Sequence, residues 1–325
     1  MNELLFAINA TAPICLLVLI GYFLKRIGFL SVSLASSLNK LVFRLFLPAM
    51  LFLNVYKIQS FSEIDFTFVW YAIGVTVLLF GVGFLVVLCF SKENAKRGVL
   101  LQAIFRANFS LVGISLATSL FGDAGAMMAT VLSAFLIPLF NLLAILSLSV
   151  FSSEQKPSLK SFLIKTAKNP LIISILSGFV LLGVRALFVH FGVAFRLTDI
   201  EPIYKTINSL SSVATPLALI ALGGQFEFSA ISSLKREIIF GVCVRCVAIP
   251  ILAVGGAYLL GVFEGAHFAT FVAAFCTPVA VSSVPMVQEM RGDTTLAGQL
   301  VVWSTLSSAL TIFIASYLLK LAGIF

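Results

Sequence analysis

Long apolar runs separated by short polar segments dominate the hydrophobic pattern of this chain. Glycine, proline, serine and charged residues bound ten runs. Most runs reach or exceed about 18–20 residues, the length at which a helix crosses a bilayer. They do not alternate between polar and apolar positions, as the strands of a membrane barrel do. The pattern predicts helices over residues 4–24, 37–56, 67–90, 98–121, 125–150, 170–191, 204–226, 238–262, 266–288 and 294–322.

Composition strengthens the membrane assignment. Hydrophobic residues make up 60% of the chain and charged residues 10%. A soluble domain with this balance would leave large apolar patches in water. The first run follows Glu3 rather than a basic segment, so we expect it to remain as a helix and not to be a cleaved signal peptide. The sequence therefore predicts an all-α integral membrane protein.

The positive net charge of +8 is spread over short loops. We expect these loops to contact anionic headgroups of the lipid bilayer and not nucleic acid. The five cysteines fall inside apolar runs, where cysteine usually packs as a small hydrophobic side chain. Cys243 and Cys246 have a metal-like spacing, but a structural zinc site needs a second pair. We therefore expect no metal and no cofactor.

Lysine and arginine are distributed unevenly between alternate loops. One set of loops carries 13 of the 21 basic residues, the opposite set carries five, and three lie within helices. Loops rich in positive charge stay in the cytoplasm. We therefore expect a multi-pass protein of the cell membrane with both termini outside the cytoplasm.

The two halves of the chain resemble each other when one is shifted along the other. A shift of 170 residues places Gly122–Asp123 on Gly292–Asp293 and aligns the hydrophobic envelopes of spans four and five with those of spans nine and ten. Residues 1–150 and 170–325 then form five-helix repeats, joined by a cytoplasmic loop at 151–169. An odd number of spans in each half inverts the second repeat, the architecture of alternating-access carriers.

Span nine contains two prolines, Pro278 and Pro285, deep in its apolar sequence. Proline removes a backbone donor and disturbs the preceding turn. Lipid cannot satisfy the freed polar groups, so a break is tolerated only where it is buried or faces water. Thr277 before Pro278 also resembles a helix cap followed by proline at the first helical position. The alternative is a simple packing kink.

The matching stretch of span four also carries residues that disfavour a helix interior. Asn108 aligns with Pro278, Gly113 with Ser283 and Ser115 with Pro285. Interrupted helices at matching positions of two halves point to a substrate site at the middle of the membrane. The amino-terminal ends of such half-helices favour an anion, because their amides are unpaired and their dipole end is positive.

Arg106 stands about eight residues, or roughly 12 Å, inside span four. An arginine at this depth needs water or a partner, and it could be the counter-charge for a carboxylate substrate. The alternative is that it snorkels or bonds to backbone carbonyls. Arg245 in span eight is a weaker candidate for the same role, and Arg44 is weaker still.

Several common signatures are missing from the sequence. Acidic residues and histidines lie near the span ends, so a proton relay is not visible. Nucleophile elbows, phosphate-binding loops and dinucleotide fingerprints are also missing. We therefore do not expect an enzyme.

Four segments carry a family resemblance: LVFRLFLPAMLF (41–52), RANFSLVGISLA (106–117), ATPLALIALGGQF (214–226) and TPVAVSSVPMVQEMRGDTTLAGQLVV (277–302). Together they resemble the bacterial branch of the auxin efflux carrier family, whose architecture is similar to that of the bile-acid sodium symporters. The resemblance implies the bacterial inner membrane and ten helices in two inverted five-helix repeats, with broken helices four and nine crossing at the site. It also implies a scaffold from spans one, two, six and seven, and a transport unit from the remaining spans. Members resembling this chain move organic anions such as malonate or malate, and plant relatives export auxin.

One motif departs from the family. Where the family often has Gly-x-Pro in span four, this chain has Gly113-Ile114-Ser115, so the first crossing helix should be broken less rigidly.

The favoured function is secondary active transport or uniport of a small organic anion, such as a dicarboxylate or an auxin-like carboxylate, by alternating access. A sodium-coupled symporter remains an alternative, with Gln288 as a further oxygen donor, and a membrane sensor or scaffold is a third. The sequence leaves the substrate, the coupling ion and a homodimer open. The expected substrate-binding residues are Arg106, Asn108, Gly113, Ser115, Thr277, Pro278, Ser282, Ser283, Pro285 and Arg245.

Overall fold

The computed structural model describes residues 2–57, 65–151, 168–193 and 196–321, and almost all of these are helical. No strand occurs within these ranges. The α-helices are α1 (Asn2–Arg26), α2 (Val32–Leu41), α3 (Leu47–Tyr56), α4 (Phe66–Phe90), α5 (Asn94–Phe105), α6 (Ile114–Val150), α8 (Pro170–His190), α9 (Glu201–Gln225), α10 (Ala230–Ser233), α11 (Lys235–Cys243), α12 (Gly256–Leu259), α13 (Gly265–Phe275), α14 (Ser283–Glu289) and α15 (Thr294–Leu321). Between them lie the π-helical turns η1 (Val42–Phe46), η2 (Phe109–Gly113), η4 (Val244–Ala248) and η5 (Pro250–Gly255), and the 3-10 turn η3 (Leu197–Asp199).

Seven helical stretches among the described residues are long and apolar enough to cross a membrane. Six of them begin and end within a few residues of predicted runs, whereas Ile114–Val150 covers the end of run 98–121 and the whole of run 125–150. The runs 98–121 and 266–288 are each divided among shorter helices. The stretches support a multi-pass membrane protein, and the number of ten spanning helices stays a prediction. The stretches are Val32–Tyr56, Phe66–Phe90, Ile114–Val150, Pro170–His190, Glu201–Gln225, Lys235–Leu259 and Thr294–Leu319.

Helix α6 consists of two helices that meet at a kink and is not one straight rod. Phe121 and Gly122 have non-helical backbone angles, and Gly122 lies in the left-handed region at φ 57°. A Cβ built on Gly125 would lie 2.1 Å from the Ala117 carbonyl oxygen. Residues eight apart in a straight helix are separated by about 12 Å, so the chain reverses at Gly122. The boundary predicted between residues 121 and 125 is therefore present.

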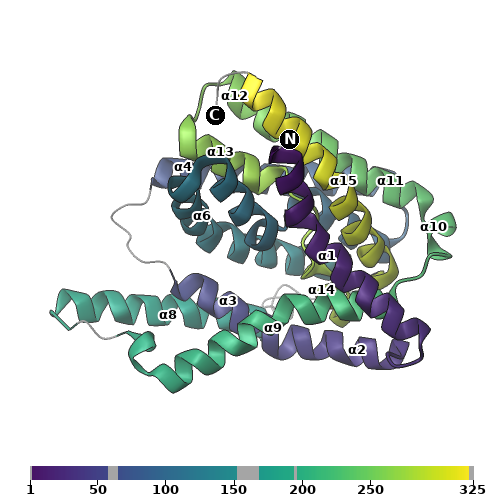
Figure 1. Cartoon of the computed structure of the whole chain (residues 1–325), viewed down its shortest axis with the longest axis horizontal. Coiled ribbons are helices and arrows are strands. Elements are labelled where there is room, and N and C mark those ends of the chain that lie inside the picture. The colour runs from purple at the N-terminus through teal and green to yellow at the C-terminus, as the bar shows by residue number, and fades with distance from the viewer. Residues whose placement is uncertain (1, 58–64, 152–167, 194–195, 322–325) are drawn as a thin grey trace.

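The helices form two layers joined by α1. Figure 1 shows α2, α3, α8 and α9 along the lower edge of the view, and α4, α6, α11, α13 and α15 above them. Helix α1 packs against α9 of the lower layer and α15 of the upper layer. A Cβ on Gly21 would lie 2.1 Å from the Ile220 oxygen, and one on Gly223 would lie 2.0 Å from the Val18 oxygen. These glycines allow α1 and α9 to pack at short range, as small residues do between membrane helices.

Candidate functional site

Two helices of the upper layer are interrupted at their centres. Helix α5 ends at Phe105, and the next helical turn starts at Phe109; α13 ends at Phe275, and α14 starts at Ser283. In the second interruption, Pro278 has no amide to donate and disfavours helical geometry at Thr277. In the first, Arg106 is extended, with φ −92° and ψ 97°.

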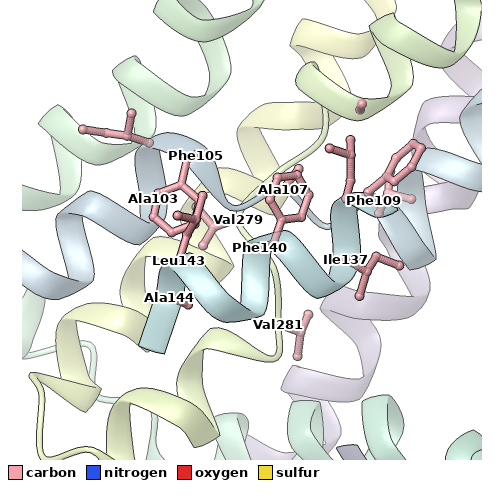
Figure 2. Close-up of a cluster of buried hydrophobic side chains, with 14 of the residues drawn as sticks. Ala103, Phe105, Ala107, Phe109, Ile137, Phe140, Leu143, Ala144, Val279 and Val281 are labelled. Carbon is pink, nitrogen blue, oxygen red and sulfur yellow. The ribbon is translucent and has the colours of Figure 1, made fainter. Parts of the chain in front are cut away.

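The two interruptions bond to each other. Ala107 and Val279 form an isolated antiparallel bridge. On either side of it, the Asn108 amide donates to the Pro278 carbonyl at 2.8 Å, and the Ala280 amide donates to the Arg106 carbonyl at 3.2 Å. Figure 2 shows the apolar residues gathered around this crossing, including Ile137 and Phe140 of α6. The exchange satisfies backbone groups that would otherwise be unpaired in an apolar interior.

Arg106 is buried at the crossing, with 1% of its surface exposed. One terminal nitrogen, Nη1, donates to Gln102 Oε1 at 2.8 Å and contacts Met286 Sδ at 3.5 Å. The other, Nη2, donates to Asn141 Oδ1 at 2.7 Å and to Ser282 Oγ at 3.0 Å. Every one of these acceptors is a neutral side chain. Within the described ranges, no carboxylate pairs with this guanidinium.

A small cavity lies beside Arg106, where the two layers meet. Its volume is about 30 Å³, which is room for very few water molecules. Its lining comes from both interruptions, from α6 and from α3 and α9 of the lower layer. The polar lining residues are Arg106, Asn108, Ser110, Asn141, Thr215 and Ser282.

Two buried polar groups at the crossing have no hydrogen-bond partner in the part of the chain that the structure describes. They are the Asn108 side-chain amide nitrogen Nδ2 and the Thr277 hydroxyl Oγ1. Asn108 lines the cavity, whereas Thr277 does not. A buried donor without a partner costs about 1–3 kcal/mol, so Asn108 favours a ligand with an acceptor oxygen.

The structure distributes the other predicted site residues around the crossing. Pro285 lies beyond the interruption as the third residue of α14, and Ser283 is the first, with its hydroxyl on the Ala280 carbonyl. Proline fits the first turn of a helix because amides there have no intrahelical partner. Gly113 lies in η2, where a Cβ would approach the Ala273 oxygen to 3.0 Å. Ser115 is exposed on α6, outside the cavity lining.

The amino-terminal amides of α14 differ from the sequence expectation. The amides of Ser283 and Val284 donate to the Ala280 and Val281 carbonyls at 3.0 and 3.2 Å, and Pro285 has no amide hydrogen. The first turn of α14 therefore offers no free donor, because the preceding turn already uses them. At this helix end, donors for an anion must come from side chains.

Arg245 is fully buried but lies outside the cavity lining. Its Nε donates to the Thr277 carbonyl at 2.7 Å, and its Nη1 and Nη2 donate to the Ile104 and Phe275 carbonyls at 3.2 Å each. All of these acceptors are backbone groups. The geometry thus separates Arg245 from the cluster formed by Arg106, Asn108 and Ser282.

Sequence reasoning missed Gln102, Asn141 and Thr215. Gln102 lies one helical turn before Arg106, and i to i+4 neighbours share a helix face, so its role could have been found. Asn141 is a rare polar residue inside the apolar run 125–150. Only its depth in that run signals a function, because intramembrane polar groups need partners.

Hydrogen bonds tie the two layers together on one side of the crossing. Asn39 Nδ2 of α2 donates to Gln225 Oε1 of α9 and to Gln288 Oε1 of α14, both at 3.1 Å. Gln225 Nε2 also donates to Gln288 Oε1 at 3.0 Å. The Gln288 oxygen considered for a sodium site is therefore already occupied. An Arg44–Glu289 ion pair adds a second link from η1 to α14.

Comparison with known proteins places the chain among transporters. An "Uncharacterized transporter" of Methanothermobacter thermautotrophicus is 24% identical over 302 residues, covering 92% of this chain and 94% of that protein. A "Putative malonate transporter" of Rhizobium meliloti is 24% identical over 311 residues, covering 94% and 93%. The "Uncharacterized transporter YfdV" of Escherichia coli is 27% identical over 294 residues, covering 86% and 87%.

The family model for membrane transport proteins matches residues 6–316. This match covers nearly the whole chain, including both interrupted helices. It confirms the resemblance to the auxin efflux carriers that the sequence motifs indicated. The chain belongs to the membrane transport protein family.

Proposed function

We propose that this protein carries small organic anions, such as dicarboxylates, across the membrane, and that the anion binds at the crossing beside Arg106. The proposal rests on one observation above all: a fully buried guanidinium at a cavity has only neutral side-chain partners. A charged residue at this depth costs at least about 2.5–3.5 kcal/mol when it is not compensated. A substrate carboxylate would supply the missing charge.

Neighbouring side chains support an anion with oxygen acceptors. Asn108 Nδ2 is buried and unpartnered among the described residues, and it lines the same cavity as Arg106. The acceptors now on Arg106, Asn141 Oδ1 and Ser282 Oγ, belong to side chains that can rotate away. A carboxylate can replace them with charge-assisted bonds, which are about twice as strong as neutral ones.

The proposed mechanism is alternating access between two inverted five-helix repeats, residues 1–150 and 170–325. Both halves contain an interrupted helix, and the interruptions pair in antiparallel fashion, which supports this relation. The basic loops, including 151–169, would face the cytoplasm and both termini the outside. Labelling of single cysteines in that loop and at the amino terminus with an impermeant reagent tests this orientation, and equal protection of both would contradict it.

The size of the cavity supports a moving site. The cavity leaves only about 30 Å³ for water-sized molecules, and we expect the layers to separate when a dicarboxylate enters. The Asn39–Gln225–Gln288 cluster and the Arg44–Glu289 pair join the layers on one side of the crossing. These bonds would have to break in one half of the transport cycle, because alternating access opens each side in turn.

A thermal-shift experiment on the purified protein tests the charge requirement directly. Malonate, malate and an indole carboxylate are compared with malonamide, a neutral analogue of malonate with similar size. We expect at least one carboxylate to raise the unfolding temperature and malonamide to leave it unchanged, because only the anions compensate Arg106. An equal shift with malonamide, or no shift with any carboxylate, contradicts the proposal.

Transport and coupling are tested in proteoliposomes loaded with the carboxylate that binds. Counterflow of labelled anion supports a carrier, whereas binding without counterflow indicates a sensor or scaffold. Replacement of sodium by choline separates the coupling alternatives. Unchanged counterflow without sodium argues against a sodium symporter, and its loss would favour one.

A further inference from the structure

We propose that Arg245 is a positioning residue of the transport site, which holds the two interrupted helices in the geometry that presents Arg106 and Asn108 to the substrate. This inference rests on the proposed function and deepens it. It assigns to Arg245 a role that needs no contact with the anion.

The three donors of Arg245 join two helices from opposite halves of the chain. Ile104 belongs to the last turn of α5, Phe275 ends α13, and Thr277 follows it. Their carbonyls accept from Nη1, Nη2 and Nε at 3.2, 3.2 and 2.7 Å. The last carbonyls of a helix have no intrahelical partner and carry its negative dipole end. Arg245 therefore offsets two negative helix ends with one positive charge.

The side chain must be arginine for this geometry. A guanidinium presents five donors in a rigid planar fork, whereas a lysine presents three donors at a single point. The acceptors lie on separate segments, so a lysine ammonium cannot bond to all three at once. Burial makes the requirement stricter, because Arg245 is 0% exposed and no water is at hand to complete the bonds.

A short chain of bonds connects Arg245 to the cavity. The Thr277 carbonyl that accepts from Nε precedes Pro278, whose own carbonyl accepts from the Asn108 amide at 2.8 Å. The Arg106 carbonyl in turn accepts from the Ala280 amide at 3.2 Å. A shift of Thr277 would thus move Asn108 and Arg106, both of which line the cavity.

Helix α15 also contacts the crossing. The Val279 amide donates to Ser304 Oγ at 3.1 Å. This bond holds only the second interruption, whereas Arg245 holds both. Among the described residues, Arg245 thus donates hydrogen bonds both to the end of α5 and to the end of α13.

The experiment uses cysteines at Ala107 and Val279 in a background with all five native cysteines replaced by alanine. These positions form a non-hydrogen-bonded antiparallel pair, with Cα atoms about 4.5 Å apart, so a disulfide can span them. Cross-linking by a membrane-permeant oxidant is measured with arginine, lysine or glutamine at position 245. A second set of proteins without the added cysteines is used for anion binding and transport.

We expect Arg245→Gln to lower the cross-linking rate several-fold and to weaken anion binding by about ten-fold or more, because three carbonyls lose charge-assisted bonds. Arg245→Lys should be intermediate in both measurements, and it keeps the test available if the glutamine variant fails to fold. For the lysine variant, KM should rise more than the maximal rate falls, since the site is displaced and not removed.

The outcomes separate this inference from the proposed function. Wild-type cross-linking and wild-type affinity in the lysine variant would overturn the positioning role, even if the protein binds anions. Slower cross-linking with unchanged affinity would also overturn it, because the crossing would then not control the site. A third outcome is that neither the wild type nor any variant binds an anion, while the cross-linking rate still depends on Arg245. The proposed function is then wrong, but Arg245 does hold the two interrupted helices together.

Discussion

Arg106 and Arg245 are both buried arginines, yet they differ in the groups that accept their hydrogen bonds. Both are at most 1% exposed, and neither pairs with a carboxylate among the described residues. Arg245 donates only to backbone carbonyls. Arg106 donates only to side chains and lines a cavity.

The difference shows how a membrane protein can use one side chain for two purposes. Backbone carbonyls at helix ends are part of the fold and cannot leave the guanidinium without distorting a helix. Side-chain acceptors can change rotamer, at a cost far below that of breaking a helix. A buried arginine held by side chains can therefore exchange partners with a ligand, whereas one held by helix ends cannot.

Among the substitutions considered, replacement of Arg106 by glutamine should have the largest effect on the affinity for the anion. Loss of a charge-assisted hydrogen bond costs about 1.5–3 kcal/mol, so we expect binding of a carboxylate to weaken by about ten- to a hundred-fold. Arg106→Lys should recover only part of the affinity, because it keeps the charge and loses the planar fork. Isothermal titration of the purified variants measures the change.

A matched control for this variant is Arg44→Gln. Arg44 also lies on an apolar helix, but 67% of its side chain is exposed and it is outside the cavity lining. The control should bind the anion nearly as the wild type does, because Arg44 does not line the cavity, although its pair with Glu289 would have to open during transport. If Arg106→Gln binds as tightly as this control, Arg106 is structural and the two buried arginines play the same role.

Replacement of the two prolines of the second interrupted helix should change the rate of anion uptake by different, smaller amounts. Pro278→Ala introduces an amide donor inside the interruption, so we expect uptake to fall several-fold at matched membrane expression. Pro285→Ala should stay near the wild-type rate, because residue 285 lies in the first turn of α14. Equal losses for both would mean that the whole segment, and not the crossing, sets the rate.

Loss of the exposed ion pair should have the smallest effect. Arg44 and Glu289 are in contact, and 67% of the Arg44 side chain is exposed, whereas Arg245 is fully buried. We expect Arg44→Gln to shift the unfolding temperature by at most a few °C, less than Arg245→Gln does, because one exposed pair is lost instead of three buried hydrogen bonds. If Arg44→Gln lowered the unfolding temperature as much as Arg245→Gln does, the exposure of an arginine would not predict its contribution to stability.

Much of the fold follows from the sequence because its signals are local. Six of the helical stretches match apolar runs within a few residues, since the thickness of the bilayer fixes the length of a spanning helix. The reversal at Gly122 follows from a glycine at a polar boundary, and it adopts φ 57°. Thr277–Pro278 marks the second interruption, because proline has no amide to donate and disfavours helical geometry at the residue before it. Proline alone does not decide this, since Pro13, Pro138 and Pro216 lie within continuous helices.

The first interruption and the roles of the arginines depend on contacts between segments that are far apart in the sequence. The sequence points to Asn108, which lies in the break at residues 106–108, but also to Gly113 and Ser115, which lie beyond it. The break itself forms where the chain pairs with residues 278–280. The partners of Arg106 include Asn141 and Ser282, which are 35 and 176 residues away. The sequence by itself thus determined the membrane helices, the reversal and the proline break, because backbone sterics and bilayer thickness act on neighbouring residues. Only the tertiary structure decided which arginine faces the cavity and which clamps the helix ends, because that depends on acceptors brought together from distant segments.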